Sequence, residues 1–149
     1  MSTRPPTLEA IADAECVRLL RTHDVGRLGV VDRDVRPLIF PVNYFFDEGV
    51  VVFRTAPGSK LDLAPGAPVC FEIDGWDDGA GTGWSVLVKG IAHDITSPRS
   101  APTGRMKYWP VQPLAPGSRE HWVGVWANEI TGRRFGPPGA REQQGVEQQ

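Results

Sequence analysis

Apolar residues in this chain occur in short runs that alternate with polar positions. The clearest run is 69–74, in which Val69, Phe71 and Ile73 occupy every second position. A period of two is typical of a β-strand that buries one face. Similar runs rich in β-branched and aromatic residues predict further strands at 25–31, 35–46, 50–55, 84–95, 121–127 and 130–135.

Polar turn sequences separate these predicted strands. Residues 32–34 (DRD) predict a tight hairpin between the first two strands, and residues 47–49 (DEG) predict the next turn. Residues 76–83 are expected to form an acidic, glycine-rich loop, and residues 97–119 an irregular proline-rich segment. Six or seven strands in meander order with only short helices describe a small antiparallel barrel, so the expected fold class is mainly β.

Helical spacing is limited to two short segments. The first is 13–22, with Asp13 as the expected N-cap, and it is expected to cover one opening of the barrel. The second is 59–64, with Ser59 as its N-cap after a Pro-Gly turn. The apolar face of the first helix would consist of Cys16, Leu19 and Leu20.

Length and composition indicate a single domain. A chain of 149 residues with 40% hydrophobic residues is sufficient for one core. The expected domain extends over 13–135, between a flexible N-terminal segment, 1–12, and a disordered tail, 136–149. The chain shows neither the apolar core of a secretory signal nor the roughly 20 apolar residues of a membrane span. We therefore expect a cytoplasmic protein without a membrane partner.

Charge and residue types argue against several kinds of chemistry. The 16 Lys and Arg residues against 18 Asp and Glu give a formal charge of −2, so a nucleic-acid partner is not expected. Two cysteines are too few for a zinc site, and the three histidines lack metal-ligand spacing, so no metal site is expected. No serine-hydrolase motif occurs either. These observations favour chemistry carried by a bound cofactor.

The segment 53–62 (FRTAPGSKLD) gathers cations and hydroxyl groups around a strand end and a helix start. Helix N-termini present unpaired N–H groups and partial positive charge, and a phosphate is stabilised further by nearby arginine and lysine. The alternative is that the serine serves only as an N-cap and the two cations are solvated surface charges. The candidate phosphate ligands are Arg54, Thr55, Ser59 and Lys60.

A proline and an asparagine interrupt the apolar segment 39–46 (IFPVNYFF). Proline donates no hydrogen bond to a neighbouring strand, so this segment is expected at a sheet edge or bulged near Pro41. Backbone groups beside the proline are then available to the edge of a flat heterocycle. The alternative is an ordinary edge strand in which a local turn satisfies Asn43.

Tryptophans mark the remaining candidate positions. Trp84 begins the strand 84–95, where it either flanks a cofactor or closes the barrel. Trp109, Trp122 and Trp126 cluster late in the chain. They either line a pocket or pack in the core or in a dimer interface, where tryptophan is enriched.

The order of these motifs resembles that of one known family. GRLGVV, FPVNYFF, VVFRTAPGSK, VCFEIDGWD, GWSVLVKGIA and EHWVGVWANEITGRRF follow one another along the chain. Together they look like the pyridoxamine phosphate oxidase-like, flavin-binding split-barrel family, over about residues 13–135. The resemblance implies a six-stranded antiparallel split β-barrel with short helices that pairs into a homodimer. It also implies two flavin mononucleotides (FMN) held in clefts between the subunits.

The resemblance implies roles for the candidate residues as well. Val42 and Asn43 would meet the edge of the flavin ring, and the four candidate phosphate ligands would hold the phosphate. Trp84 and Ser85 would lie near the cofactor. Trp109 and Trp122 would reach over from the partner subunit. No side chain is assigned as a catalytic acid or base. The implied cofactor-binding residues are Val42, Asn43, Arg54, Thr55, Ser59, Lys60, Trp84, Ser85, Trp109 and Trp122.

The chemistry of the family is divided among oxidases, flavin reductases, nitroimidazole reductases, haem-degrading relatives and deazaflavin-dependent reductases. This sequence does not show the extended substrate-binding tail of the true pyridoxamine phosphate oxidases, so the expected function is an FMN-dependent oxidoreductase of another small organic substrate. One alternative is a deazaflavin-dependent reductase of the same fold, although three lysines are few for an anionic polyglutamate tail. The other alternative is a non-enzymatic flavin- or haem-binding module.

Overall fold

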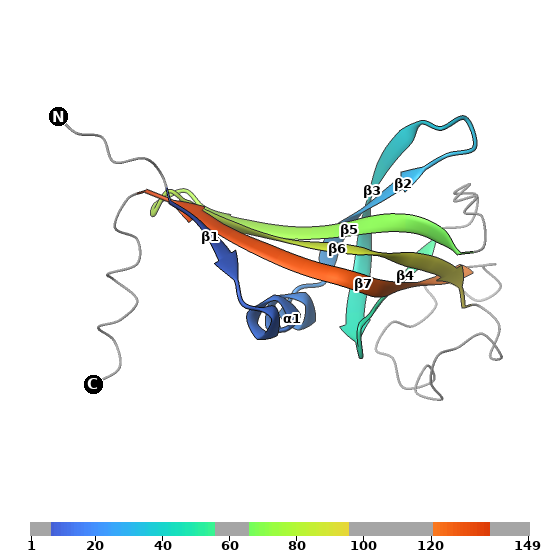
Figure 1. Ribbon diagram of the computed structural model, residues 1–149, viewed down its shortest axis with the longest axis horizontal. Coiled ribbons are helices and arrows are strands. Elements are labelled where there is room, and N and C mark those ends of the chain that lie inside the picture. The colour runs from blue at the N-terminus through green and yellow to red at the C-terminus, as the bar shows by residue number, and fades with distance from the viewer. Residues whose placement is uncertain (1–6, 56–65, 96–120, 138–149) are drawn as a thin grey trace.

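The computed structural model describes residues 7–55, 66–95 and 121–137, which form a mainly antiparallel β structure with one helix (Figure 1). This agrees with the expected fold class. Each predicted strand within the described ranges is present. The elements in chain order are β1 (Thr7–Ile11), α1 (Asp13–Thr22), β2 (Val25–Val31), β3 (Pro37–Asp47), β4 (Val50–Thr55), β5 (Ala67–Asp77), β6 (Thr82–Asp94) and β7 (His121–Gly136).

Six of the strands close into a ring. The hydrogen-bonded order is β1-β7-β4-β3-β2-β5-β6, and β6 also pairs with β7, so that β2 to β7 form a barrel and β1 extends it. The predicted meander order is wrong at one connection, because β5 pairs with β2 instead of with β4. Alternation along a strand specifies which face is buried but not which strand lies beside it.

The core lies inside this ring and under the helix. The predicted alternation of β5 is confirmed, since Val69, Phe71 and Ile73 are all buried. The other strands each turn one row of side chains inward, and β4 is also buried on its outer face, where Val50 and Val52 form a second cluster with Ile95. Core residues of the remaining barrel strands include Leu28, Tyr44, Phe53, Val86 and Val125.

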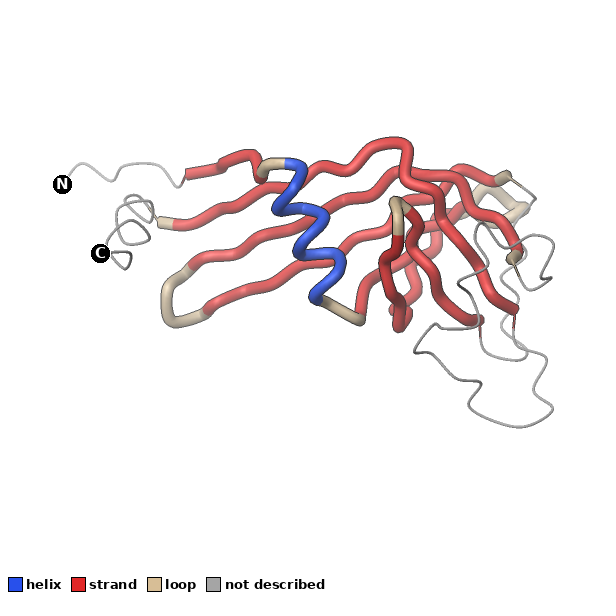
Figure 2. The backbone as a smooth tube through the Cα atoms, turned by 90° about the horizontal axis from the view of Figure 1, so that it is seen from below, coloured by secondary structure: helices blue, strands red, loops and turns tan. Residues whose placement is uncertain are grey.

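Helix α1 begins and ends where the spacing predicts, and it packs against β7, β3 and β6 (Figure 2). The N-cap, however, is Ala12 and not Asp13. Ala12 has an extended backbone, and its carbonyl accepts hydrogen bonds from the amides of Glu15 and Cys16, at 3.0 Å each. Asp13 is therefore the first helical residue, where its charge still favours the positive end of the helix dipole. The predicted apolar face is confirmed, because the buried helix residues are Cys16, Leu19 and Leu20.

The turns explain where the strands end. Between β2 and β3 the Asp32 carboxylate accepts hydrogen bonds from the amides of Asp34 and Arg36, at 2.9 Å each. Glu48 and Gly49 both have positive φ, 48° and 82°, as in the tight turns that favour hairpins. The predicted loop 76–83 is much shorter in the structure, because the β5–β6 pairing continues to Asp77 and Thr82.

Strand β7 differs most from the prediction. Residues 121–127 and 130–135 form one continuous strand of 16 residues, not a hairpin. Gly90 of β6 pairs with Ala127 and Lys89 with Glu129, so Asn128 is an extra residue opposite a register shift. A β-bulge absorbs such a residue without turning the chain.

Residues 7–11 lie in the N-terminal segment for which the sequence predicts no element. They form β1, which pairs with the last five residues of β7, 132–136. In the described part of the chain, α1 has ten residues, and no helix there is long and apolar enough to cross a membrane. The same ranges contain no group of three His, Cys, Asp or Glu side chains arranged to hold a metal.

The register shift predicts a mutation-sensitive glycine. A Cβ on Gly90 would overlap the backbone carbonyl oxygen of Trp126, so Gly90→Ala should lower the free energy of unfolding by about 1–3 kcal/mol. Gly79→Ala is the matched control, because its Cβ meets only the carboxylate of Asp77 at 3.4 Å. Urea unfolding measures both. Equal stabilities for the two variants would contradict the close approach of the strands at the bulge.

Candidate functional site

Arg54 lies at the end of β4 on the outer face of the barrel. Its strand neighbour Phe53 belongs to the core, so alternation directs Arg54 outward. It is directly opposite Trp122 of β7, and its guanidinium carbon lies 5.4 Å from the centroid of that ring. Both side chains are half-buried. This is a cation–π arrangement, which orients the guanidinium while leaving its charge in place. Trp122 thus lies beside Arg54 of its own subunit, whereas the resemblance implies that it reaches the cofactor from the partner subunit.

Two more predicted residues adjoin Arg54. The β3–β4 register ends at the pair Tyr44 and Phe53, so Asn43 and Arg54 are the next residues on the two strands. Asn43 is exposed, whereas Val42 is half-buried and packs against the core. The structure thus brings several predicted residues together at what we call the Arg54 end of the barrel, defined as Val42, Asn43, Arg54, Thr55 and Trp122.

Trp84 and Ser85 lie elsewhere on the barrel and face opposite sides of β6. Ser85 faces outward, level with Asp74 of β5 and Arg133 of β7. Trp84 faces the helix side, where its ring meets the edge of the His23 ring at a centroid distance of 4.8 Å. Of the two residues, only Ser85 therefore shares the outer face with Arg54.

The separation between Arg54 and Ser85 can be counted along strand β7, because both residues lie beside it. Arg54 is level with Trp122, and Ser85 is level with Arg133, eleven residues further along the strand. At about 3.3 Å per residue this corresponds to roughly 35 Å of extended chain. This length along the strand exceeds the length of a flavin mononucleotide.

Three predicted site residues lie outside the described residues, so their roles in cofactor binding remain predictions. They are Ser59, Lys60 and Trp109.

The outer face also carries an ionic cluster that the sequence analysis does not identify. The Nη1 atom of Arg27 on β2 lies 3.2 Å from a Glu72 carboxylate oxygen and 3.3 Å from one of Asp74. Burial of its carboxyl, together with the hydrogen bond and charge of Asp74, raises the pKa of Glu72 to about 7, although Arg27 acts in the opposite direction. Glu72 is therefore able to hold or release a proton near neutral pH, two residues along β5 from Asp74, the residue level with Ser85. The strand alternation places both carboxylates on one face, but the approach of Arg27 depends on the β2–β5 pairing.

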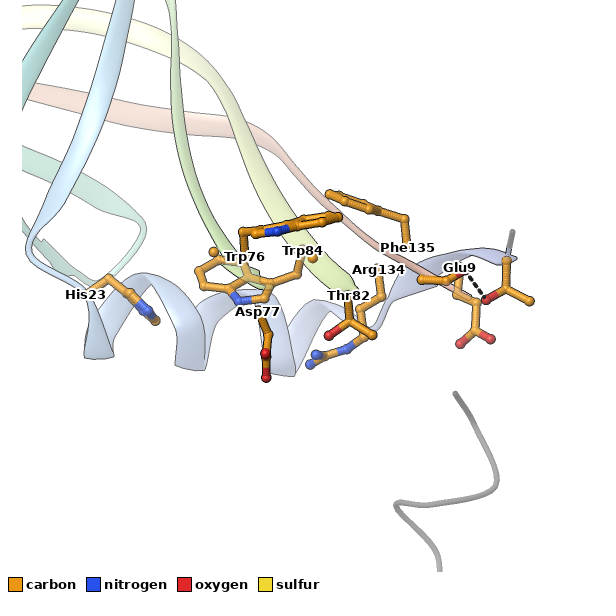
Figure 3. Close-up of a pocket in the computed structure, with 12 residues that line it drawn as sticks. Glu9, His23, Trp76, Asp77, Thr82, Trp84, Arg134 and Phe135 are labelled. Atoms are coloured by element: carbon orange, nitrogen blue, oxygen red, sulfur yellow. Dashed lines mark hydrogen bonds between the residues drawn. The ribbon is translucent and has the colours of Figure 1, made fainter. Parts of the chain in front are cut away.

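On the opposite, helix side of the sheet lies a cavity of about 310 Å³, which we call the helix-side cavity (Figure 3). It lies where β5 and β7 end and β6 begins, beside β1 and the residue that follows α1. Sequence reasoning singles out Trp84 but not this cavity, because its wall is completed by segments distant in the chain. Its labelled lining side chains include Glu9, His23, Asp77, Thr82, Trp84 and Arg134.

The closed ring of six antiparallel strands with a packed helix defines the class of this protein as a split β-barrel. A family model described as pyridoxamine 5'-phosphate oxidase matches residues 12–134. The chain belongs to this family, which confirms the resemblance drawn from the order of its motifs.

Individual proteins are also similar to this chain. The FAD binding protein from Mycobacterium smegmatis is 33% identical, with a TM-score of 0.73 over 86% of this chain and 98% of that one. A conserved protein of unknown function from Corynebacterium diphtheriae is 30% identical, with a TM-score of 0.71 over 86% and 98% of the two chains. Uncharacterized protein Rv0080 of Mycobacterium tuberculosis is 38% identical over 90 residues, 56% of this chain. That match spans 59% of the length of Rv0080.

The raised pKa of Glu72 predicts a pH-dependent stability. The folded chain retains this proton up to about pH 7, whereas an ordinary glutamate releases it near 4.5. Retaining this proton stabilises the folded state. This contribution to the free energy of unfolding is complete below about pH 4.5 and is lost as the pH rises to 7. Between pH 5 and pH 8 the wild type should lose about 1–3 kcal/mol relative to Glu72→Gln in urea unfolding.

Glu129→Gln is the control, because this exposed glutamate on β7 forms an ion pair of 3.6 Å with the similarly exposed Lys89. It should follow the wild type at both pH values. A wild-type minus Glu72→Gln difference that is the same at pH 5 and pH 8 would show that Glu72 ionises at its ordinary pKa.

Proposed function

We propose that this chain binds a flavin at the Arg54 end and uses it to oxidise or reduce a small organic substrate. The observation that carries the proposal is the outward-facing Arg54, held against Trp122 and next to the exposed Asn43. It is supported by family membership and by the relative from M. smegmatis, which is described as an FAD binding protein.

The residues at the Arg54 end suit the two ends of a flavin. The guanidinium offers paired N–H donors and a permanent charge to a phosphate. The Asn43 carboxamide offers a donor and an acceptor to the edge of the ring system. Within the described residues, Pro37–Asn43 pair only with β2, so the other edge of this segment also presents backbone groups. When bound, the flavin supplies hydride chemistry, while the chain supplies binding, orientation and electrostatics.

The proposed site lies between two copies of the chain. One reason is the separation of Arg54 from Ser85, since both can contact one flavin only from different subunits. The other is the β2–β3 hairpin, which projects from the barrel in Figure 1 and exposes apolar side chains on both faces. Exposed apolar surface of this kind marks association sites. Its exposed apolar residues are Val31, Val35, Leu38, Ile39 and Phe40.

The proposal is tested by titrating flavin-free protein with FMN, FAD and a deazaflavin coenzyme while following ligand fluorescence. FMN remains the expected cofactor, and the three titrations separate it from FAD and from the deazaflavin alternative. Turnover of NAD(P)H with an electron acceptor, compared with free flavin, then distinguishes an oxidoreductase from a non-enzymatic flavin carrier. Absence of saturable binding for all three ligands contradicts the proposal.

The assignment of Arg54 and Lys60 as phosphate ligands predicts the effect of removing their positive charges. Arg54→Ala should weaken flavin binding by about 1.5–3 kcal/mol, the range for hydrogen bonds to charged groups, and Lys60→Ala should act similarly. Arg21→Ala, at the exposed end of α1, is the control and should bind as the wild type does. Unchanged affinity in the Arg54→Ala/Lys60→Ala double variant would place the phosphate elsewhere.

The two-subunit site predicts the mass of the flavin-loaded protein. Light scattering should give about twice 16.3 kDa, because a lone subunit leaves one side of the flavin uncovered. Ile39→Asp, which puts a charge on the projecting hairpin at a position 73% exposed, should lower both the mass and the flavin content. A species of 16.3 kDa that retains one flavin per chain would contradict the intersubunit site.

A further inference from the structure

The helix-side cavity does not belong to the proposed flavin site. Ser85 faces outward on β6, whereas its neighbour Trp84 and His23 line the cavity on the other side of that strand, and β4, which carries Arg54, contributes no lining residue. Its volume of about 310 Å³ is at the lower end of the range of small-molecule sites, about 300–1,000 Å³. We propose that this cavity is a separate ligand site for a flat aromatic molecule that carries a positively charged amino or amidino group.

The aromatic part of the site is the half-buried indole of Trp84. A Cβ on Gly75, its cross-strand partner, would overlap the indole, so the missing side chain lets the ring lie against β5. The His23 ring meets the indole at 64°, an edge-to-face contact that fixes its orientation. A fixed aromatic ring at a cavity wall suits a flat ligand, and its negative face attracts a cation.

The polar part of the site favours a ligand that donates hydrogen bonds. The charged lining side chains are Glu9, Asp77 and Arg134, with a formal sum of −1. Arg134 also donates to Glu15 of α1 at 3.1 Å, which offsets part of its positive charge, because Glu15 also accepts from Arg18 at 2.6 Å. One oxygen of Asp77 already accepts from the amide of Ala80 at 3.1 Å. The carboxylates of Asp77 and Glu9 still give the lining an excess of negative charge, which disfavours an anion.

His23 adds a further acceptor. Its Nδ1 lies 2.8 Å from the carbonyl oxygen of Leu19, the arrangement of an Nδ1–H donor. In the neutral ring the second nitrogen, Nε2, then carries the acceptor lone pair. The lining therefore combines an aromatic wall, two carboxylates and an imidazole acceptor, which is complementary to an aromatic cation and not to a phosphate.

The proposal is tested with three probes of nearly equal shape and different charge: benzamidine, benzamide and benzoate. Each is titrated into the ¹⁵N-labelled full chain, and amide chemical shifts report the location and the affinity. Benzamidine should shift the amides of Gly75, Thr82 and Gly83 saturably and bind at least tenfold more tightly than benzoate. Equal affinities for benzamidine and benzoate, or shifts centred on Asn43 and Arg54, would overturn the proposal.

Variants test the charge argument independently of flavin binding. Glu9→Gln/Asp77→Asn should weaken benzamidine at least tenfold and leave benzamide within about twofold. Asp34→Asn/Glu48→Gln makes the same change in net charge on two distant turns and should leave benzamidine affinity unchanged. Arg54→Ala should also leave it unchanged, so a failure of flavin binding and a failure of this site are distinguishable. Equal losses in the two double variants would overturn the assignment of the cation to the cavity.

Discussion

The pairing of β7 with three other strands is the constraint on which the rest of the structure depends. Its first half closes the barrel against β4, its last five residues hold β1, and β6 lies along its other edge. The extra residue Asn128 shifts the alternation, so that Trp122 and Arg133 face outward although one has an even number and the other an odd number. Without the bulge, Arg133 would face the helix side and Arg134 would leave the cavity.

The two ends of β7 therefore carry different chemistry on different faces. At its start, Trp122 orients the guanidinium of Arg54 on the outer face, where the proposed flavin phosphate would gain charge-assisted hydrogen bonds. Near its end, Arg134 is bound to Glu15 on the helix side, beside the indole of Trp84. Strand β7 thus contributes to the Arg54 end, where we propose that a phosphate binds, and to the helix-side cavity, where we propose that a cation binds. In the proposed two-subunit site, a second subunit brings the outer, later half of β7 to the Arg54 end.

Much of the fold is predictable from the sequence, because strand alternation and turn residues are local signals. The pattern at Val69, Phe71 and Ile73 gives a buried strand face correctly, and the spacing of 13–22 gives the helix bounds. The continuity of β7 is not predictable in this way, because Asn128 and the following residues resemble a turn until β6 is placed beside them. Likewise, Arg54 is identifiable as a candidate, but its contact with Trp122, 68 residues later, depends on barrel closure. The cavity depends on the docking of α1 beside Trp84.

A crystal structure of the chain grown with FMN tests the central claim most directly, because it locates both the phosphate and the ring. The phosphate should lie within hydrogen-bond distance of the Arg54 guanidinium, with the ring edge near Asn43 and the outer face of a second subunit beside it. A flavin seated in the helix-side cavity, or held on the outer face of one subunit without contact to Arg54, would contradict this account.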